Sequence, residues 1–481
     1  MPAKDFYVAI ELGSSKITGL AGQKRMDGSI NVLAIATEPA ATCIRKGVVY
    51  NIDKTNQCIR NIVQKLQNAL QTEIKLVHVG IGGQGIRSVS NTLTVDFDEA
   101  TVVNHATIDS MMDANRNARY ANQTKLDVAP QEYKVDSQYQ IDPVGIECSR
   151  IEGNFLNIVW RDAFCRNLYK CFEQSGMPEP RYYLTQMALA DNILSETERR
   201  TGCVLVDLGA GTTTVSIYYK NILRHIVTIP LGGNNITKDI TSFHIDEMEA
   251  DKLKLKYGAA YTSSSEIDPE MKISIDPQRS IPYREFVNLV EARVEEIIKN
   301  VLAQIPTEYA DKLGGGIILT GGGINMKNME TTFRKYSNIE RVRVASTITA
   351  SVNAAKGVTL ENNGKLCAAL ALLQKSDQIS SGRPLNEVNT LFGNELEPVT
   401  ETTTTMQRDP ATIKPGQVLT GREREAEEEA RKRAEDEKRR EEEAEEKRKA
   451  EEEEKRKQNS FINKVRRHIL DFGKKMVEPE E

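Results

Sequence analysis

Two short stretches of the chain place a carboxylate, glycines and hydroxyls together in an order that suits phosphate chemistry. Each begins with an acidic residue, Glu11 in the first and Asp207 in the second, and small residues follow. Glycines let backbone N–H groups approach phosphate oxygens closely, and hydroxyls can donate to the same oxygens. A carboxylate suits Mg²⁺, which keeps most of its waters and takes few protein ligands. The predicted phosphate-binding residues are Gly13, Ser14, Ser15 and Lys16 in the first stretch, and Gly209, Ala210, Gly211, Thr212 and Thr213 in the second.

A single stretch of this kind also fits a tight β-hairpin turn that needs glycine for a positive φ. The same plan, however, occurs twice, as VAIELGSSKITGL from Val8 and as VLVDLGAGTTTVSIY from Val204. Each copy predicts a strand, a glycine-rich turn and a second strand, with an acid at the same place. The repeat favours the phosphate interpretation, and it predicts two related halves that face each other.

A third glycine cluster ends another predicted strand, in the segment GGGIILTGGGINM at residues 314–326. Such a turn can lie flat against an adenine or a ribose. Glycine runs are often loops, so this cluster alone would be weak evidence. Its place after the two phosphate turns predicts nucleoside contacts for Gly321, Gly322 and Gly323.

The segments that must position these turns have the periodicity of an α/β protein. Apolar residues recur at helical spacing over 51–70, and LVHVGIGG at 76–83 predicts a buried strand that ends in glycines. Residues 86–160 differ in character and predict a small α+β module inserted in the chain. Further helices are predicted over 162–175, 184–199, 234–257, 284–304 and 366–374.

The composition limits what else the chain can be. A chain of 481 residues is too long for one core and predicts two to four globular units plus extensions. Its formal net charge of −5 gives no bulk basic field for nucleic acid. Seven scattered cysteines without a CxxC pair argue against a zinc site and fit a reducing compartment. No signal peptide is predicted, and no stretch of about 18 apolar residues occurs, so any membrane link is expected to be peripheral.

The order of these motifs resembles that of the ATPase superfamily of actin, the heat-shock chaperone ATPases and sugar kinases. Within it, the chain resembles the FtsA family of bacterial cell-division proteins over about residues 1–375. The insertion at about 86–160 lies where that family carries its distinctive subdomain. The matching stretches are LVHVGIGG at 76–83, APQEYKVD at 129–136, DPVGI at 142–146, LRHIVTIPLGGNNITKDI at 223–240 and GIILTGGG at 316–323.

The resemblance implies roles for individual residues at the phosphates. The two turns would hold the phosphates of ATP, and Glu11 and Asp207 would act on Mg²⁺ through water. Gly232 and Gly233 would approach the phosphates from the facing side. Glu11 is longer than the aspartate common in this superfamily, and no residue that positions an attacking water can be identified. The resemblance therefore leaves hydrolysis open, and ATP could stabilise filaments more than it fuels them.

At the nucleoside, the resemblance implies contacts with the ribose. Asp251 and Lys254 lie three residues apart on one predicted helix face and match positions that hold the ribose in related proteins. Asp251 is shorter than the glutamate more usual there, and a solvated surface face is the alternative for this pair. Gly321 to Gly323 would lie at the nucleoside.

These patterns together predict an α/β, actin-like, two-lobed ATPase fold with an inserted small α+β subdomain, followed by a disordered linker and a charged helix with an amphipathic tip. Four prolines, a threonine run and few aromatics predict the linker. The predicted parts are the first lobe at 1–85 and 161–200, the inserted subdomain at 86–160, the core of the second lobe at 201–240 and 313–375, its helical subdomain at 241–312, the linker at 376–420, the charged spacer at 421–457 and the tip at 458–481.

The charged spacer consists almost only of Glu, Asp, Lys, Arg and Ala. It lacks apolar a and d positions, which argues against a coiled coil. Acid-to-base pairs at i,i+4, such as Glu429–Arg433 and Glu443–Lys447, each add about 0.2–0.5 kcal/mol to an isolated helix. We predict a solvated single helix, up to roughly 55 Å long at about 1.5 Å per residue, with a disordered charged linker as the alternative.

The last segment, SFINKVRRHILDFGKKMV from Ser460, has the pattern of an interfacial helix at an anionic membrane. A helix that docks its apolar stripe on the protein's own core is the alternative, but the long spacer makes such docking unnecessary. The resemblance points to the membrane as well. The predicted membrane-binding residues are Phe461, Ile462, Val465, Ile469, Phe472 and Met476 on the apolar face, with Lys464, Arg466, Arg467, Lys474 and Lys475 beside it.

The resemblance therefore implies a protein that binds ATP and Mg²⁺, forms filaments with itself and lies on the cytoplasmic side of the inner membrane. It would tether the tubulin-like division protein FtsZ to an anionic membrane surface at the division site and help to recruit later division proteins, without nucleic acid. Filaments would make many weak tip helices act together. The alternatives are an actin-like adaptor ATPase of another membrane machine, such as a pilus assembly platform, and a sugar-kinase-like enzyme. The inserted module and the tip favour division.

Overall fold

The computed structural model describes residues 5–174, 176–276, 278–385, 415–421, 423–426, 429–433 and 439–440. The chain divides into two compact units, one of residues 1–393 with 414–418 and one of residues 394–413 with 419–481. We call the first unit the body. It contains two large hydrophobic cores, one in each lobe, and a small core in the inserted module. The predicted tip at 458–481, with all its membrane-binding residues, lies outside the described residues.

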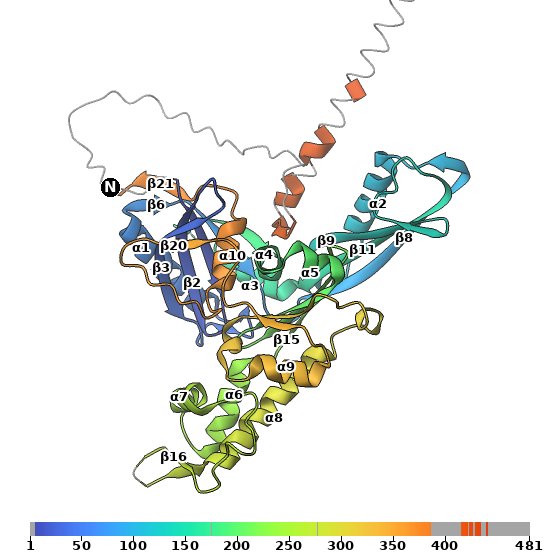
Figure 1. Cartoon of the computed structure of the whole chain (residues 1–481). Coiled ribbons are helices and arrows are strands. Elements are labelled where there is room, and N and C mark those ends of the chain that lie inside the picture. The colour runs from blue at the N-terminus through green and yellow to red at the C-terminus, as the bar shows by residue number, and fades with distance from the viewer. Residues whose placement is uncertain are drawn as a thin grey trace, which may run out of the picture. The chain divides into compact units, whose positions relative to one another are not determined.

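The first lobe is built on a seven-stranded sheet with the order β20-β3-β2-β1-β7-β12-β22. β1, β2 and β3 are antiparallel neighbours, whereas β7 pairs parallel with β1, and β12 pairs parallel with β7. Helix α1 packs on β2 and β3, and α10 packs on β1, β2 and β7, from opposite sides of these strands (Figure 1). The strands are β1 (Tyr7–Leu12), β2 (Lys16–Lys24), β3 (Ile30–Pro39), β7 (Leu76–Ile81), β12 (Glu179–Leu184), β20 (Val352–Ala354) and β22 (Gln417–Val418), and the helices of this lobe are α1 (Ile52–Leu70), α3 (Asp162–Lys170), α4 (Thr185–Ile193), α5 (Glu196–Thr201) and α10 (Cys367–Lys375).

The second lobe and the inserted module share a nine-stranded sheet with the order β10-β9-β11-β8-β15-β14-β13-β18-β19. In the second lobe, α8 packs against α6 and α9, and α6 packs against α7. Apolar residues of α8 recur four apart at Phe286, Val290, Val294 and Ile298 and are buried, which confirms the helix predicted there. The elements are β13 (Cys203–Leu208), β14 (Thr213–Tyr219), β15 (Ile222–Ile229), β18 (Gly316–Thr320), β19 (Val342–Val344), α6 (Gly233–Ile240), α7 (Glu247–Tyr257), α8 (Tyr283–Leu302) and α9 (Met329–Ser337).

The inserted module projects from the body as long strands with one helix on them (Figure 1). Its core is formed by Met111 of the helix and by strand residues such as Tyr133, Ile151 and Phe155. Because the strands alternate between this core and solvent, the module folds around its own apolar cluster. Its elements are β8 (Arg87–Val102), α2 (His105–Asn117), β9 (Gln123–Val135), β10 (Gln138–Gln140) and β11 (Glu147–Arg161).

The remaining short elements are β4 (Ile44–Arg45), β5 (Val48–Val49), β6 (Thr72–Ile74), β16 (Lys272–Ser274), β17 (Ser280–Pro282), β21 (Ser381–Pro384), η1 (Thr241–Phe243), η2 (Thr307–Tyr309) and η3 (Gly322–Asn325).

The internal repeat is present as two equivalent hairpins, β1–β2 and β13–β14. Glu11 and Asp207 occupy the same place in them, opposite Thr18 and Thr214 respectively. The likeness extends further than the sequence pattern indicates, because the first strand of each hairpin also pairs parallel with a strand that runs into glycines. These strands are β7 beside β1 and β18 beside β13.

Two predicted helices are each divided in the structure. Residues 184–199 form α4 and α5, which are separated because Ser195 caps α5 in a reciprocal capping box with Glu198. Residues 234–257 form α6 and α7, and Asp246 caps the second of them. In the sequence, the apolar periodicity continues across both breaks, so each pair was predicted as one helix. The breaks are marked only by the polar residues that cap the helices.

The predicted linker at 376–420 is wrong at both of its ends. Residues 381–384 form β21, which pairs with β6, and residues 417–418 form β22, which pairs with β12. The Ser380 hydroxyl accepts the backbone N–H of Val8, 372 residues away, and Val418 is 1% exposed. These segments are held by distant partners, so local composition does not reveal them.

Part of the predicted spacer is described. Residues 421, 423–426, 429–433 and 439–440 are helical, and the rest of 421–457 lies outside the described residues. Arg433 and Glu429 form the expected i,i+4 ion pair at 3.6 Å. Within the described part of the chain, every helix is too short or too polar to cross a bilayer.

Candidate functional site

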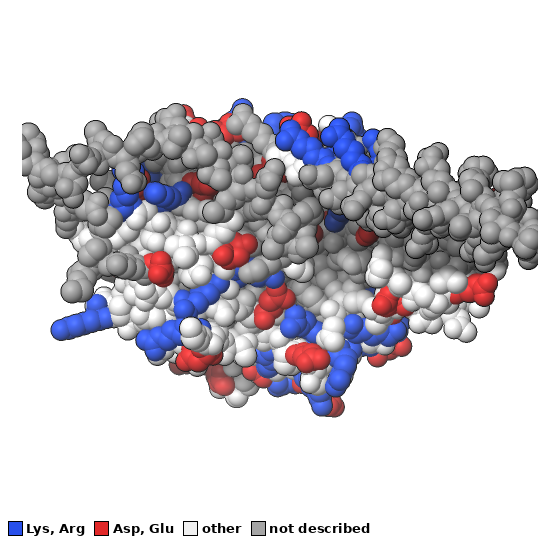
Figure 2. Space-filling model, turned by 90° about the horizontal axis from the view of Figure 1, so that it is seen from above, with Lys and Arg blue, Asp and Glu red and all other residues white. Residues whose placement is uncertain are grey.

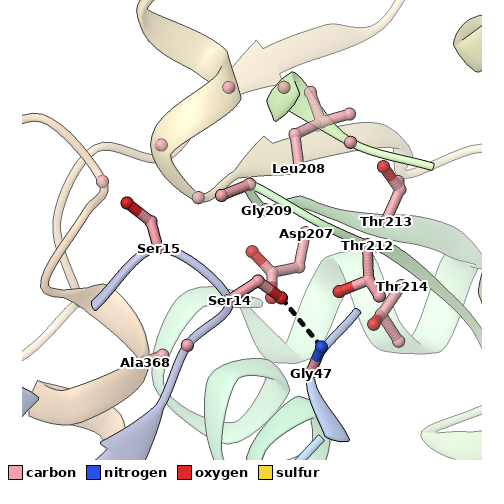
Figure 3. A pocket seen from close by; sticks show the side chains of 18 of the residues that line it. Ser14, Ser15, Gly47, Asp207, Leu208, Gly209, Thr212, Thr213, Thr214 and Ala368 are labelled. Atoms are coloured by element: carbon pink, nitrogen blue, oxygen red, sulfur yellow. Dashed lines mark hydrogen bonds between the residues drawn. The ribbon is translucent and has the colours of Figure 1, made fainter. Parts of the chain in front are cut away.

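A pocket of about 450 Å³ lies in the body and is lined by residues of both lobes. It gathers the predicted phosphate, metal and nucleoside residues from segments more than 300 residues apart in sequence. Gly211 is the one predicted member that does not line it. Figure 3 shows Ser14 and Ser15 on one side of this space, with Asp207, Gly209 and Thr212 facing them.

The two glycine-rich turns meet at the pocket. A Cβ placed on Gly211 would lie 2.6 Å from the Ser14 Oγ, so this glycine permits the close approach of the second turn to the first. The Ser14 Oγ also accepts the backbone N–H of Gly47 at 2.8 Å, drawn as the dashed line in Figure 3. The hydroxyl hydrogen of Ser14 therefore remains available for a further acceptor.

Glu11 and Asp207 bring two half-buried carboxylates to the same space. Burial raises the pKa of Glu11 to about 7, with the nearby charge of Asp207 adding to the rise and Lys16 opposing it. Burial likewise raises the pKa of Asp207 to about 6. Among the described residues, neither carboxylate forms an ion pair, so a cation that enters the pocket would meet two carboxylates poised to ionise.

The side chains in the pocket suit a metal ion that keeps most of its water molecules better than one bound only by protein ligands. The described residues include no cluster of three or more His, Cys, Asp or Glu side chains that could hold a metal. Two carboxylates beside glycine-rich turns suit Mg²⁺, which retains several waters and shares its remaining positions with phosphates. Glu11 and Asp207 are the residues that would hold such an ion through water.

Several of the residues predicted to contact phosphate form hydrogen bonds within the chain. The N–H of Gly233 donates to the Gly209 carbonyl at 3.1 Å, and that of Gly232 donates to the Asn235 side chain at 3.0 Å. The Thr213 hydroxyl, which is fully buried, donates to the Leu231 carbonyl at 2.9 Å. These hydrogen bonds hold the second turn in place, and the contacts of these residues with phosphate stay a prediction.

The predicted pair Asp251 and Lys254 lies on α7 at the edge of the pocket. Their charged atoms are 2.5 Å apart, and Lys254 also donates to the Thr237 hydroxyl at 2.7 Å. The Lys254 side chain is 12% exposed, whereas that of Asp251 is 48% exposed. The pair therefore presents a fixed carboxylate at the rim, which could accept hydrogen bonds from hydroxyls of a ligand.

The third glycine cluster lies against the second carboxylate. Gly321 has φ +86°, and a Cβ there would lie 2.4 Å from the Asp207 Oδ1 and 2.7 Å from the Leu208 carbonyl. Only glycine fits this position without moving Asp207. Gly321, Gly322 and Gly323 all line the pocket.

Sequence reasoning missed several lining residues. Gly47 comes from the β4–β5 hairpin. Gly83 follows β7, and the internal repeat places it in the first half where the third glycine cluster follows β18 in the second half. Gln186, at the start of α4, is 5% exposed and donates to the Ser216 hydroxyl at 3.0 Å, while its Oε1 has no hydrogen-bond partner among the residues that the structure describes. The glycines after β7 were a usable signal, whereas nothing local marked Gly47 or Gln186.

Two family models match the chain. One is described as Cell division protein FtsA and matches residues 204–369, and the other is described as SHS2 domain inserted in FTSA and matches residues 83–159. The first covers the core of the second lobe, and the second covers the inserted module.

Comparisons with individual relatives agree with these matches. The chain is 32% identical over 336 residues to the cell division protein FtsA of Porphyromonas gingivalis, which covers 68% of this chain and 70% of that protein. It is 30% identical over 327 residues to the cell division protein FtsA of Pseudomonas aeruginosa, which covers 66% and 78% respectively.

A solved structure, that of a PilM-PilN type IV pilus biogenesis complex, is similar in fold. It superposes with a TM-score of 0.53 at 13% identity and covers 77% of this chain and 98% of that chain. At this identity the likeness concerns the fold alone. The predicted α/β, actin-like, two-lobed fold with an inserted α+β subdomain is confirmed for the body.

Proposed function

Because the chain belongs to the FtsA family of cell division proteins, we propose that it binds Mg–ATP in the pocket, forms filaments beneath the cytoplasmic membrane and tethers FtsZ to that membrane. Its role in cell division follows from the family. The observation that supports the finer proposal is the meeting of two glycine-rich turns, each with a half-buried carboxylate of raised pKa, in one pocket between two lobes.

The phosphates of ATP would lie between the two turns. Ser14, Ser15 and Thr212 offer hydroxyls, and Lys16 offers a positive charge at the first turn. Mg²⁺, when bound, neutralises the negative charge of the phosphates. The ionised side chains of Glu11 and Asp207 would orient its water shell.

The nucleoside would lie toward the third glycine cluster and the rim. Gly321, Gly322 and Gly323 present backbone without side chains, which permits a flat group to approach closely. The carboxylate of Asp251, held by Lys254, is placed to accept hydrogen bonds from ribose hydroxyls.

A ligand in this pocket would mainly hold the two lobes together. The first turn belongs to the sheet of the first lobe, and the second turn belongs to the sheet of the second lobe. A nucleotide that contacts both turns binds the closed arrangement in preference to an open one, so it stabilises that arrangement by mass action. We propose that this closed body is the form that assembles with copies of itself and with later division proteins.

The membrane contact would come from the tip at 458–481, which the spacer at 421–457 joins to the rest of the chain. On the face of the molecule seen in Figure 2, acidic and basic side chains are interspersed over the described residues. A mixed surface of this kind attracts an anionic membrane weakly. The tip sequence instead combines an apolar face with five basic residues, and filaments would multiply its weak binding.

Vesicle co-sedimentation tests this proposal. We expect the full-length protein to pellet with anionic vesicles, and to do so more strongly with Mg–ATP and to bring FtsZ with it. A protein ending at residue 457 should remain in the supernatant with at least tenfold less lipid-bound material, because it lacks the interfacial helix. Neutral vesicles and unchanged ATP binding by the shortened protein are the controls. If neither protein pellets, the tether proposal is wrong.

The two pocket carboxylates predict a pH dependence of Mg–ATP binding. Both pKa values are raised, to about 7 for Glu11 and about 6 for Asp207, so the protonated forms persist to near-neutral pH. Affinity for Mg–ATP should therefore rise between pH 6 and pH 8, as the carboxylates ionise and attract the metal. In the ligand-free body the sign is opposite: both carboxyls hold their protons more tightly in the folded than in the unfolded chain, so the melting temperature should fall as the pH rises from about 4 to about 7 and change little above that.

The Glu11→Gln variant separates this effect from the titration of ATP itself. It removes the group with the higher pKa, so its affinity should change less between pH 7 and pH 8 than that of the wild type. Calorimetric titration of both proteins at fixed Mg²⁺ measures the difference. Parallel pH profiles would exclude Glu11 from the metal site.

A further inference from the structure

Residues 415–418 form a short strand segment at the outer edge of the first lobe. β22 lies last in the sheet order and pairs antiparallel with β12, with Tyr182 opposite Val418. The backbone N–H of Leu184 donates to the Gly416 carbonyl at 2.7 Å. Gln417 and Val418 are 5% and 1% exposed, so the segment is seated in the body although the neighbouring sequence is polar.

The inserted module holds the same segment from the other side. The Gly416 N–H donates to the Asp127 Oδ2 at 2.8 Å, while the other oxygen of Asp127, on β9, accepts the N–H of Val128 at 2.8 Å. Gly416 has φ +84°, and a Cβ there would lie 3.2 Å from the Met187 Cβ on α4. The segment thus touches β12, α4 and β9 at once, and its geometry requires glycine at 416.

The docked segment is small compared with the chain on either side of it. Only two residues pair as a strand, and Val418 is the one apolar side chain that they bury. On the N-terminal side, 29 residues (386–414) separate it from the last residue described before it. On the C-terminal side, Thr420 and Glu423 form reciprocal bonds at the start of the helical spacer. Elements with so little buried surface open locally without global unfolding.

We propose that residues 415–418 are a detachable docking strand that sets the length of the tether, with the edge of β12 and Asp127 as their docking site. When the strand is docked, the free part of the tether begins after residue 418. When it is released, residues 386–418 join the tether and lengthen its reach by up to about 110 Å of extended chain. The effect on tether length rests on the proposed function, whereas the docking of residues 415–418 does not.

Hydrogen exchange of the full-length protein tests the docking. In the wild type, the amide of Leu184 should be protected. The Gly416→Ala variant, which strains the backbone and crowds Met187, and the Asp127→Ala variant, which removes the acceptor without adding bulk, should each exchange about tenfold faster there. The radius of gyration from X-ray scattering should increase in both, while the melting temperature of the body stays close to that of the wild type.

Matched controls lie nearby in the chain. Gly421→Ala adds a methyl group where no atom of the described residues lies within 4 Å, and Asp142→Ala removes a carboxylate from an exposed turn of the same module. Both should behave as wild type. Unchanged exchange in Gly416→Ala and Asp127→Ala would overturn the proposal, and protection that falls on dilution would assign the strand to a second copy and overturn it as well. These measurements use neither membrane nor nucleotide, so a failure of vesicle binding would leave their outcome intact.

Discussion

The Asp207→Ala variant should bind Mg–ATP about 10- to 100-fold more weakly than the wild type. Asp207 is the penultimate residue of the first strand of the second hairpin, lines the pocket together with Glu11 and is half-buried. Loss of a hydrogen bond to a charged group costs about 1.5–3 kcal/mol, and each 1.4 kcal/mol is tenfold in affinity. Titration calorimetry with ATP at saturating Mg²⁺ measures the change.

The same variant should also change how the melting temperature of the protein responds to Mg–ATP. The raised pKa of Asp207 means that its ionised form is unfavourable in the ligand-free body at neutral pH. The melting temperature without ligand should therefore stay the same or rise, while the increase that Mg–ATP produces in the wild type should disappear. Asp311→Ala is the matched control, because Asp311 is exposed on the same lobe and outside the pocket. Wild-type affinity in Asp207→Ala would remove this residue from the metal site.

The Gly321→Ala variant should lose both stability and affinity. Its backbone has φ +86° and ψ 174°, a region that is nearly restricted to glycine and costs about 1–3 kcal/mol for other residues. In addition, the new Cβ would lie 2.4 Å from the Asp207 Oδ1, so this carboxylate must move. We expect at least a tenfold loss of Mg–ATP affinity and a lower melting temperature without ligand.

Gly357→Ala separates backbone strain from displacement of the carboxylate. Gly357 has φ +89°, but no atom lies within 4 Å of its Cβ position. This control should lower the melting temperature while leaving affinity unchanged. If Gly321→Ala and Gly357→Ala bind Mg–ATP equally well, contact between the third glycine cluster and Asp207 is not important for the site.

Much of the candidate site could be predicted because its residues are carried by short contiguous motifs. A strand, a glycine turn and an acid at a fixed place are visible in the sequence at Glu11 and again at Asp207. The hairpins form locally, since both strands and the turn lie within about fifteen residues. The predicted helices at 51–70 and 284–304 were equally accessible, because buried residues recur at helical spacing in α1 and α8.

Other roles depend on what a residue touches, and the sequence does not contain that information. Gly232, Gly233 and Thr213 carry the right chemical groups for phosphate, yet their donors are used by Asn235, Gly209 and Leu231. Gly47 joins the pocket because a two-residue turn brings its N–H to Ser14. Such pairings become visible only when the competing acceptors are in place.

The sequence by itself determined the fold class, the two related halves, the inserted module and the two carboxylate-bearing turns, because local periodicity and glycine spacing encode them. Tertiary structure alone decided which donors remain free, how burial raises the pKa values of Glu11 and Asp207, and that residues 415–418 belong to the body. The physical reason is the separation in sequence over which each effect acts. Strand and helix propensities act between neighbours in sequence, whereas desolvation and strand pairing act between groups that the folded chain brings together.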